Sequence, residues 1–214
     1  MAFIFFDLDG TITDSQEGIL NSIIYALKKM NRDIPNRATL RKMIGPPLIN
    51  GFADILQIPD DELETAVDFY REYFSKKGLF ENRVYDGIPD LLKQLQKEKH
   101  TLAIATSKPE IFAATILEHF QLNQYFSNIV GATLDGSLSQ KDEILAQAIL
   151  NVQANPKKSV MIGDRKHDII GAKINHISSI GVTWGFGSLD ELRQNGANEI
   201  VNQPNEIWKY VQSI

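Results

Sequence analysis

The sequence contains no cysteine among its 214 residues. Disulfide bonds, thiolate metal sites and cysteine nucleophiles are therefore excluded. It also has no run of the ~20 apolar residues that a membrane-spanning helix needs. The apolar start, MAFIFFDLDG, is too short for a signal peptide and has no basic flank before it. We therefore expect a cytoplasmic protein without a membrane partner.

An excess of positive charge is also missing. Lys and Arg number 22 against 27 Asp and Glu, which gives a formal net charge of -5. Proteins that bind nucleic acids usually carry a basic surface, so we expect no nucleic-acid partner. Apolar residues make up 43% and charged residues 23%, as in ordinary globular proteins. The length suits one medium domain or a core domain with a smaller inserted one.

Short apolar runs alternate with segments of helical periodicity. The runs read as strands buried on both faces of a sheet, at residues 2–6, 102–105, 129–130, 159–162, 179–182 and 199–201. Helical spacing of apolar residues occurs at 88–95, 111–117, 144–149 and 207–211. This alternation predicts an α/β fold with a Rossmann-like parallel sheet and right-handed crossovers.

One region interrupts the alternation. Residues 15–82 contain helical patterns but no convincing strand, and Pro35, Gly45 to Pro47 and Pro59 separate those patterns. We predict a helical domain, 15–82, inserted into a core domain of 1–14 and 83–214. Ligands of open α/β sheets bind beyond the carboxyl ends of the strands, so we expect the insert to cover the site as a cap.

Asp7 and Asp9 follow the first predicted strand directly. Residues two apart on an extended chain point the same way, so both carboxylates are presented together, and Gly10 allows a sharp turn. Two close carboxylates repel each other, which favours a proton on one of them. Such a pair suits nucleophilic and acid–base chemistry. A solvated Asp-Gly turn is the alternative.

A second acidic segment, Gly163 to Asp168, follows another predicted strand. Asp164 could join Asp7 in holding a hard cation, because Mg²⁺ prefers carboxylate oxygens, water and phosphate. We expect Asp168 to support the metal site by contacting a metal ligand and not the metal itself. The alternative for Asp168 is a helix cap or a first-turn acid.

Two further segments could bind phosphate. Thr106 and Ser107 offer a hydroxyl and backbone N–H groups at a strand–helix junction, and Pro109 stands where the first helical turn would begin. Lys141 lies at the start of a predicted helix, where it could act as a point charge on phosphate and on Asp7. The alternatives are a simple Ser/Thr cap and a solvated surface lysine.

Together these segments resemble the haloacid dehalogenase (HAD) superfamily, in its phosphoglycolate phosphatase-like branch with a helical cap. The resemblance covers the whole chain and consists of four motifs in the family's order. They are a DxDGT motif, a Ser/Thr, a Lys and a GDxxxD motif, matched here by Asp7, Asp9, Gly10, Thr11, Thr106, Lys141, Gly163, Asp164 and Asp168. The segments IGPPL and GDRKHDIIGAK also resemble relatives described as 5′-nucleotidases. Departures are Asp142, where a proline often follows the lysine, and Arg165, where a small residue often follows the aspartate.

The resemblance implies a phosphatase that works through an aspartyl-phosphate on Asp7, with Asp9 as general acid and base. It implies Mg²⁺ held by Asp7, Asp164 and the main-chain carbonyl of Asp9. Predicted contacts to the phosphate or substrate are Gly10, Thr106, Ser107 and Lys141, with Arg41 and Gly45 from the insert.

Several alternatives remain open at this point. A sugar phosphomutase of the same superfamily would share Asp7, Asp9 and the cap, and a non-catalytic phosphate-binding or receiver-like module would share the acidic pocket. The partner is expected to be a small phosphate ester. 2-Phosphoglycolate and nucleoside 5′-monophosphates come first, and sugar phosphates and pyrophosphate are also candidates. The chain is expected to act as a monomer or a homodimer.

Overall fold

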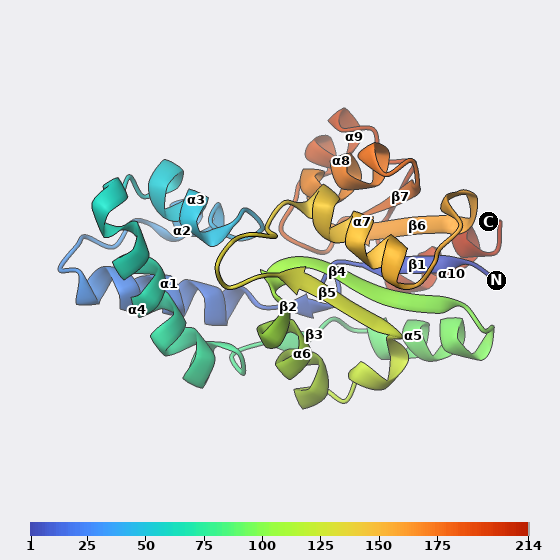
Figure 1. Cartoon of the computed structure of the whole chain (residues 1–214), viewed down its shortest axis with the longest axis horizontal. Helices are drawn as coiled ribbons and strands as arrows, with labels where there is room; N and C mark the ends of the chain where they lie inside the picture. The colour runs from blue at the N-terminus through green and yellow to red at the C-terminus, as the bar shows by residue number, and fades with distance from the viewer. Residues whose placement is uncertain (214) are drawn as a thin grey trace. The chain divides into compact units, whose positions relative to one another are not determined.

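The computed structural model, which describes residues 1–213, contains a six-stranded parallel sheet (Figure 1). Its order is β5-β4-β1-β6-β7-β8. The strands are β1 (Phe3–Phe6), β4 (Thr101–Pro109), β5 (Asn128–Ala132), β6 (Ser159–Gly163), β7 (Ser178–Val182) and β8 (Glu199–Val201). The predicted α/β fold class is confirmed, because the short apolar runs became strands of one buried parallel sheet.

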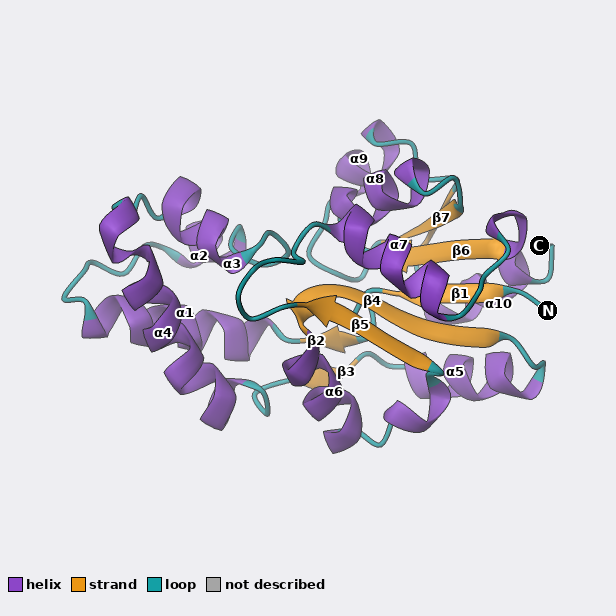
Figure 2. Ribbon diagram, in the orientation of Figure 1, coloured by secondary structure: helices purple, strands orange, loops and turns teal. Residues whose placement is uncertain are grey.

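Helices cover both faces of this sheet, as Figure 2 shows. They are α5 (Ile88–Lys97), α6 (Glu110–His119), α7 (Lys141–Asn151), α8 (Lys166–Ile174), α9 (Leu189–Gln194) and α10 (Pro204–Val211). The spacing of apolar residues did not indicate α8 and α9, although a helix cap was one interpretation of Asp168. In α8, Ile170 and Ile174 are exposed while Ile169 and Ala172 are buried, so its apolar residues do not mark a single face.

The strand order changes direction at β1. From β1 the chain moves to β4 and β5 on one side, and then to β6, β7 and β8 on the other. In register, Phe6 lies opposite Ile104 of β4 and Ile162 of β6. The residues that follow Phe6, Ile104 and Ile162 therefore emerge at the same level, at the switch point where α/β proteins bind ligands.

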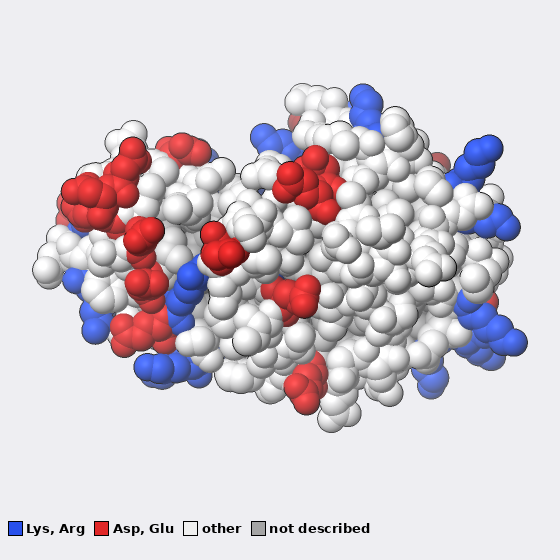
Figure 3. Space-filling view, viewed as in Figure 1, with Lys and Arg blue, Asp and Glu red and all other residues white. Residues whose placement is uncertain are grey.

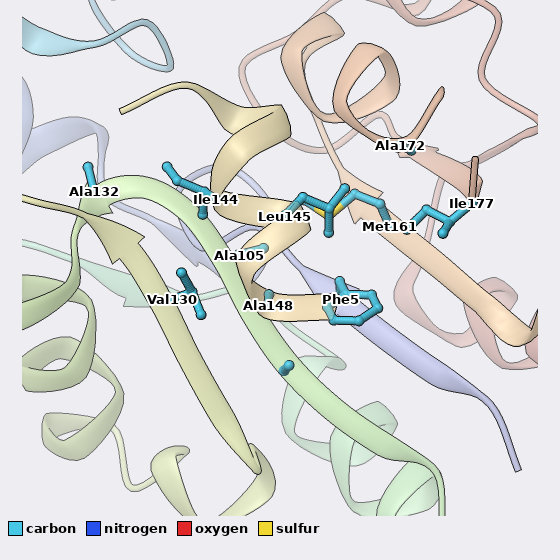
Figure 4. Packing of buried hydrophobic residues seen from close by; sticks show 11 residues of the cluster. Phe5, Ala105, Val130, Ala132, Ile144, Leu145, Ala148, Met161, Ala172 and Ile177 are labelled. Carbon is cyan, nitrogen blue, oxygen red and sulfur yellow. The ribbon is translucent and has the colours of Figure 1, made fainter. Parts of the chain in front are cut away.

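Helix α7 is held by a buried apolar cluster on one face of the sheet (Figure 4). Ile144, Leu145 and Ala148 of the helix are fully buried in it, together with Phe5 of β1 and Met161 of β6. Residues three and four apart share a helix face, so this packing turns the first residue of α7, Lys141, toward the same side.

Contacts divide the chain into two units. Unit 1 comprises Met1–Thr13 and the chain from Val84 onward, and unit 2 comprises Asp14–Arg83. Two short strands, β2 (Thr13–Asp14) and β3 (Arg83–Val84), pair at the places where the chain passes between the units.

Unit 2 is helical. It contains α1 (Gln16–Lys29), α2 (Arg37–Arg41), α3 (Leu48–Asn50) and α4 (Leu63–Tyr73), with π-helical turns at Gly51–Ile55 and Phe74–Gly78. Helix α1 packs against α4 and against the second π-helical turn. A side chain on Gly18 would collide with the Gly78 carbonyl, so a glycine there permits close contact.

No helix within residues 1–213 has the length and apolarity that crossing a membrane requires. On the face shown in Figure 3, acidic and basic side chains stand in separate small groups rather than in one broad patch of either sign.

Candidate active site

The turn after β1 presents Asp7 and Asp9. Gly10 has a φ of 83°, a left-handed conformation that favours glycine, and its N–H donates to the Thr13 carbonyl at 2.8 Å. A Cβ on Gly10 would also collide with the carboxylate of Asp164. Gly10 therefore both permits the turn and allows the β1 and β6 tips to approach each other.

Lys141 connects two carboxylates at this edge of the sheet. Its Nζ lies 2.9 Å from Asp7 Oδ1 and 2.8 Å from Asp168 Oδ1, and it donates to the Ala105 carbonyl at 3.0 Å. The ammonium is buried, with 6% of the side chain exposed. Burial alone would lower the pKa of Lys141, but the Asp168 and Asp7 carboxylates raise it above its ordinary value. The lysine is thus held as a buried cation beside Asp7.

Asp164 is completely buried and is held by a loop that follows β7. The N–H groups of Phe186 and Gly187 donate to Asp164 Oδ2 at 2.6 and 3.3 Å, and the Thr11 hydroxyl lies 3.5 Å from Oδ1. The indole N–H of Trp184 donates to the Thr11 carbonyl at 3.1 Å. The sequence did not indicate that this loop holds Asp164. Almost every residue has a backbone N–H, so a role of that group cannot be recognised from the residue type.

Asp168 serves as both an ion-pair partner and a helix cap. Besides Lys141, it accepts a hydrogen bond from the Arg165 N–H at 3.0 Å and forms a capping box at the start of α8. Burial is the largest influence on its pKa, which is raised to about 6 although Lys141 opposes the rise. Both carboxylate oxygens of Asp168 are thus engaged by the protein.

The tip of β4 differs from the expectation. The strand was predicted to end at Ala105 with a helical turn beginning at Pro109, but β4 continues to Pro109, which caps α6. The pairing with β5 shifts register between Thr106 and Pro109. This irregularity keeps the chain extended past its regular pairing, so Thr106 and Ser107 lie on a strand and not at a helix N-terminus. Thr106 is buried and Ser107 is half-buried.

The site contains a second buried lysine, Lys108, whose role was not predicted from the sequence. Lys108 Nζ lies 3.0 Å from Asp9 Oδ2, and only 4% of its side chain is exposed. Its N–H also donates to the Thr106 hydroxyl at 3.3 Å. Asp7 and Asp9 were expected to repel each other. In the structure each carboxylate faces a lysine of its own, which is Lys141 for Asp7 and Lys108 for Asp9.

The carboxylates of Asp7, Asp164 and Asp168 form a group that fits a metal ion. One oxygen from each lies within 4.8 Å of the others, and all three residues are buried. Burial, together with Asp168 and Asp7, raises the pKa of Asp164 well above its ordinary value. Lys141 pairs with two of these three acids, and a divalent cation would supply further positive charge to the group.

The contacts of the individual carboxylate oxygens show which of the three acids could bind a metal ion. Within residues 1–213, no hydrogen bond or ion pair engages Asp7 Oδ2, and Asp164 Oδ1 has only the long contact with Thr11. Oxygen donors of this kind suit Mg²⁺. Asp7 and Asp164 therefore each have an oxygen available to a metal ion, whereas the two oxygens of Asp168 already contact Lys141 and the Arg165 N–H.

The predicted contacts from the insert belong to unit 2. Arg41 is exposed at the end of α2, and Gly45 has a φ of 109°. Their role in binding substrate stays a prediction, as do the roles assigned above to the residues of unit 1.

Acids and buried lysines at the carboxyl edge of a parallel sheet are suited to transferring phosphoryl groups. Comparison with known proteins identifies the particular family. The model for haloacid dehalogenase-like hydrolases matches residues 4–182, so the chain belongs to that family.

Individual relatives agree over nearly the full chain. A 5′-nucleotidase from Pseudomonas aeruginosa is 45% identical over 190 residues, 89% of this chain and 86% of the relative. The crystal structure of a "predicted phosphatase" from Clostridium acetobutylicum is 45% identical, with a TM-score of 0.95 over 100% of this chain and 99% of the other. The tyrosine-protein kinase PtkA of Mycobacterium tuberculosis is 38% identical over 93% of this chain and 68% of its own. The chain is a HAD-type phosphatase, as the motifs indicated.

Proposed function

We propose that this phosphatase is a Mg²⁺-dependent phosphomonoester hydrolase that acts on a small phosphorylated metabolite through an aspartyl-phosphate on Asp7. The observation that carries the proposal is the position of the Asp7 carboxylate. One of its oxygens faces Lys141 at 2.9 Å, whereas the other has no partner within residues 1–213. With the carboxylate fixed by this ion pair, one of its oxygens can attack phosphorus while the other contacts the metal ion.

In the first step, an Asp7 oxygen attacks phosphorus while the ester P–O bond breaks on the far side. The leaving oxygen takes a proton from Asp9. In the second step, Asp9 takes a proton from water, whose oxygen attacks the aspartyl-phosphate and releases phosphate and Asp7. A positioned acid–base group of this kind is typically worth ~10²–10⁴ in rate.

Local cations compensate for the acidic balance of the protein. The net charge of -5 does not attract a phosphate ester, so the buried ammonium of Lys141 must supply attraction close to the phosphoryl oxygens. Thr106 and the Ser107 N–H would orient another oxygen. Mg²⁺, held by Asp7, Asp164 and the Asp9 carbonyl, would neutralise charge on the transferring group.

For the substrate, we propose a nucleoside 5′-monophosphate or 2-phosphoglycolate. The 45% identity to a 5′-nucleotidase supports the first, and the motif pattern supports the second. We further propose that the inserted helical unit acts as a cap that selects the substrate, with Arg41 and Gly45 among its contacts. A cap on two connections could exclude water in the first step and admit it in the second.

The test is a phosphate-release screen over nucleoside monophosphates, 2-phosphoglycolate, sugar phosphates and pyrophosphate, with and without EDTA. Turnover should require Mg²⁺ and should disappear in Asp7→Asn. Conversion of one sugar phosphate into another without phosphate release would instead identify a mutase. A stable phosphoenzyme that does not turn over would identify a receiver-like switch.

One relative, PtkA, is named a tyrosine-protein kinase, so a tyrosine hydroxyl should be tested as a second acceptor of the phosphoryl group. The same screen should include a tyrosine peptide with labelled ATP. Label in the peptide rather than in free phosphate would show that a tyrosine hydroxyl replaces water as the acceptor.

A further inference from the structure

We propose that Lys108 is a positioning residue that holds the Asp9 carboxylate for proton transfer in both steps. This inference rests on the proposed function, in which Asp9 is the acid and base. None of the four family motifs described above includes Lys108.

The first support is that the Asp9 carboxylate has few polar contacts besides Lys108. Its Oδ1 atom is buried and has no hydrogen-bond partner within residues 1–213, whereas Oδ2 faces the Lys108 ammonium at 3.0 Å. A buried carboxylate oxygen without a partner is costly, and that cost favours rotation of the side chain toward water. The Lys108 charge offsets the cost and keeps Asp9 in place.

The second support is the rigidity of the lysine's own backbone. Lys108 lies in the part of β4 where the register with β5 shifts, its N–H is bonded to Thr106, and Pro109 follows it. A Cβ on Gly131 of β5 would collide with the Lys108 carbonyl, so the two strands are in close contact here. The backbone that carries the Lys108 side chain is therefore held by these contacts, unlike the backbone of a mobile surface loop.

The third support is the division of work between the two buried lysines. Lys141, from α7, contacts Asp7 and Asp168, whereas Lys108, from β4, contacts Asp9. The nucleophile and the acid–base group lie only two residues apart, yet they are fixed by cations from different elements. A change at Lys108 should therefore disturb proton transfer and leave nucleophilic attack intact.

The two half-reactions can be separated by the leaving group. An alkyl phosphate needs a proton on its departing oxygen, whereas 2,4-dinitrophenolate leaves without one. Hydrolysis of the aspartyl-phosphate needs Asp9 as a base with either substrate. Loss of Asp9 positioning should therefore slow both steps for the alkyl ester but only the second step for the aryl ester.

The experiment compares wild type, Lys108→Met, Lys108→Arg and a surface control, each with Mg²⁺. The control is Lys93→Met, since Lys93 is exposed on α5. In Lys108→Met, turnover of an alkyl phosphate should fall by about 10²-fold or more. With 2,4-dinitrophenyl phosphate, the same variant should release a burst of one phenolate per enzyme and then turn over slowly. The burst rate should stay within about threefold of the wild-type first turnover. Lys108→Arg, which keeps the charge, should recover part of the alkyl phosphate activity, and Lys93→Met should match wild type.

The possible results distinguish a positioning role of Lys108 from a direct contact with the phosphoryl group and from failure of the proposed function. Equal losses on both esters without a burst, in a variant with a wild-type thermal unfolding curve, would show that Lys108 contacts the phosphoryl group and would overturn the positioning role. Unchanged kinetics in Lys108→Met would also overturn it. A wild type that hydrolyses neither ester would overturn the proposed function and this inference with it. If Lys108→Met does not fold, Lys108→Gln carries the same test, and a missing burst there refutes the inference.

Discussion

Replacing Lys141 with methionine tests the charge balance of the site through protein stability. Methionine keeps the unbranched shape of the side chain but removes the ammonium that faces Asp7 at 2.9 Å and Asp168 at 2.8 Å. Both carboxylates would then remain buried without a cation. Removing one partner of a buried ion pair typically costs ~3–5 kcal/mol. We expect a loss of this size in the free energy of unfolding.

The assay is thermal unfolding followed by circular dichroism at pH 7 without divalent ions. For a chain of this length, each kcal/mol lowers the melting temperature by roughly 2–4 °C, so the expected decrease is about 6–20 °C. Lys93→Met, on the exposed side of α5, should change stability by no more than about 0.5 kcal/mol. Adding Asp168→Asn to Lys141→Met should restore part of the loss, because it removes one of the two stranded charges. A loss below about 1 kcal/mol for Lys141→Met would refute the view that this lysine balances a buried acidic cluster.

Three further predictions follow from other contacts. Saturating Mg²⁺ should stabilise the wild type by about 2.7 kcal/mol at 100 times its dissociation constant, and Asp164→Asn should abolish that gain in a thermal shift assay. Gly185→Ala should lower both Mg²⁺ affinity and activity, since a Cβ there would collide with the Gly10 carbonyl and with Asp164; unchanged titration calorimetry would contradict this. Burial alone would raise the pKa of Glu191, but hydrogen bonds from the Lys166 N–H and from Arg165 lower it below its ordinary value. Its stabilising effect is therefore present above the unfolded pKa of about 4.3 and is lost as the pH falls through the lower folded value. Glu191→Gln should thus cost at most about 1 kcal/mol at pH 7 and progressively less below pH 4, measured by urea unfolding.

The sheet could be predicted from sequence because its strands are short, apolar and buried on both faces. That pattern also located Asp7 and Asp164, since each follows a strand whose neighbours in the sheet end at the same level. Lys141 was found because it begins a helix whose next turns carry Ile144 and Leu145. Residues whose position follows from element boundaries were therefore accessible to sequence reasoning.

Lys108 shows what such reasoning could not reach. A lysine after a Thr-Ser pair reads as a solvated residue at a strand end, whereas Lys108 is buried in the part of β4 where the register with β5 shifts. Register shifts arise from pairing with a distant strand and leave no local signal. The support of Asp164 by the Phe186 and Gly187 N–H groups was hidden for a similar reason, since it joins segments 22 and 23 residues apart through backbone atoms.

The central place of β1 has a consequence for how the protein matures. On a ribosome, β1 is made before both of its neighbours in the sheet, and one of them, β6, begins only at Ser159. Until then Asp7 lacks the strand beside it, and until α7 docks it also lacks Lys141. A nascent chain therefore has no assembled centre before most of unit 1 has been synthesised. During refolding, phosphatase activity should appear only when both sides of the sheet have joined β1, so the rate of its return reports completion of the whole sheet.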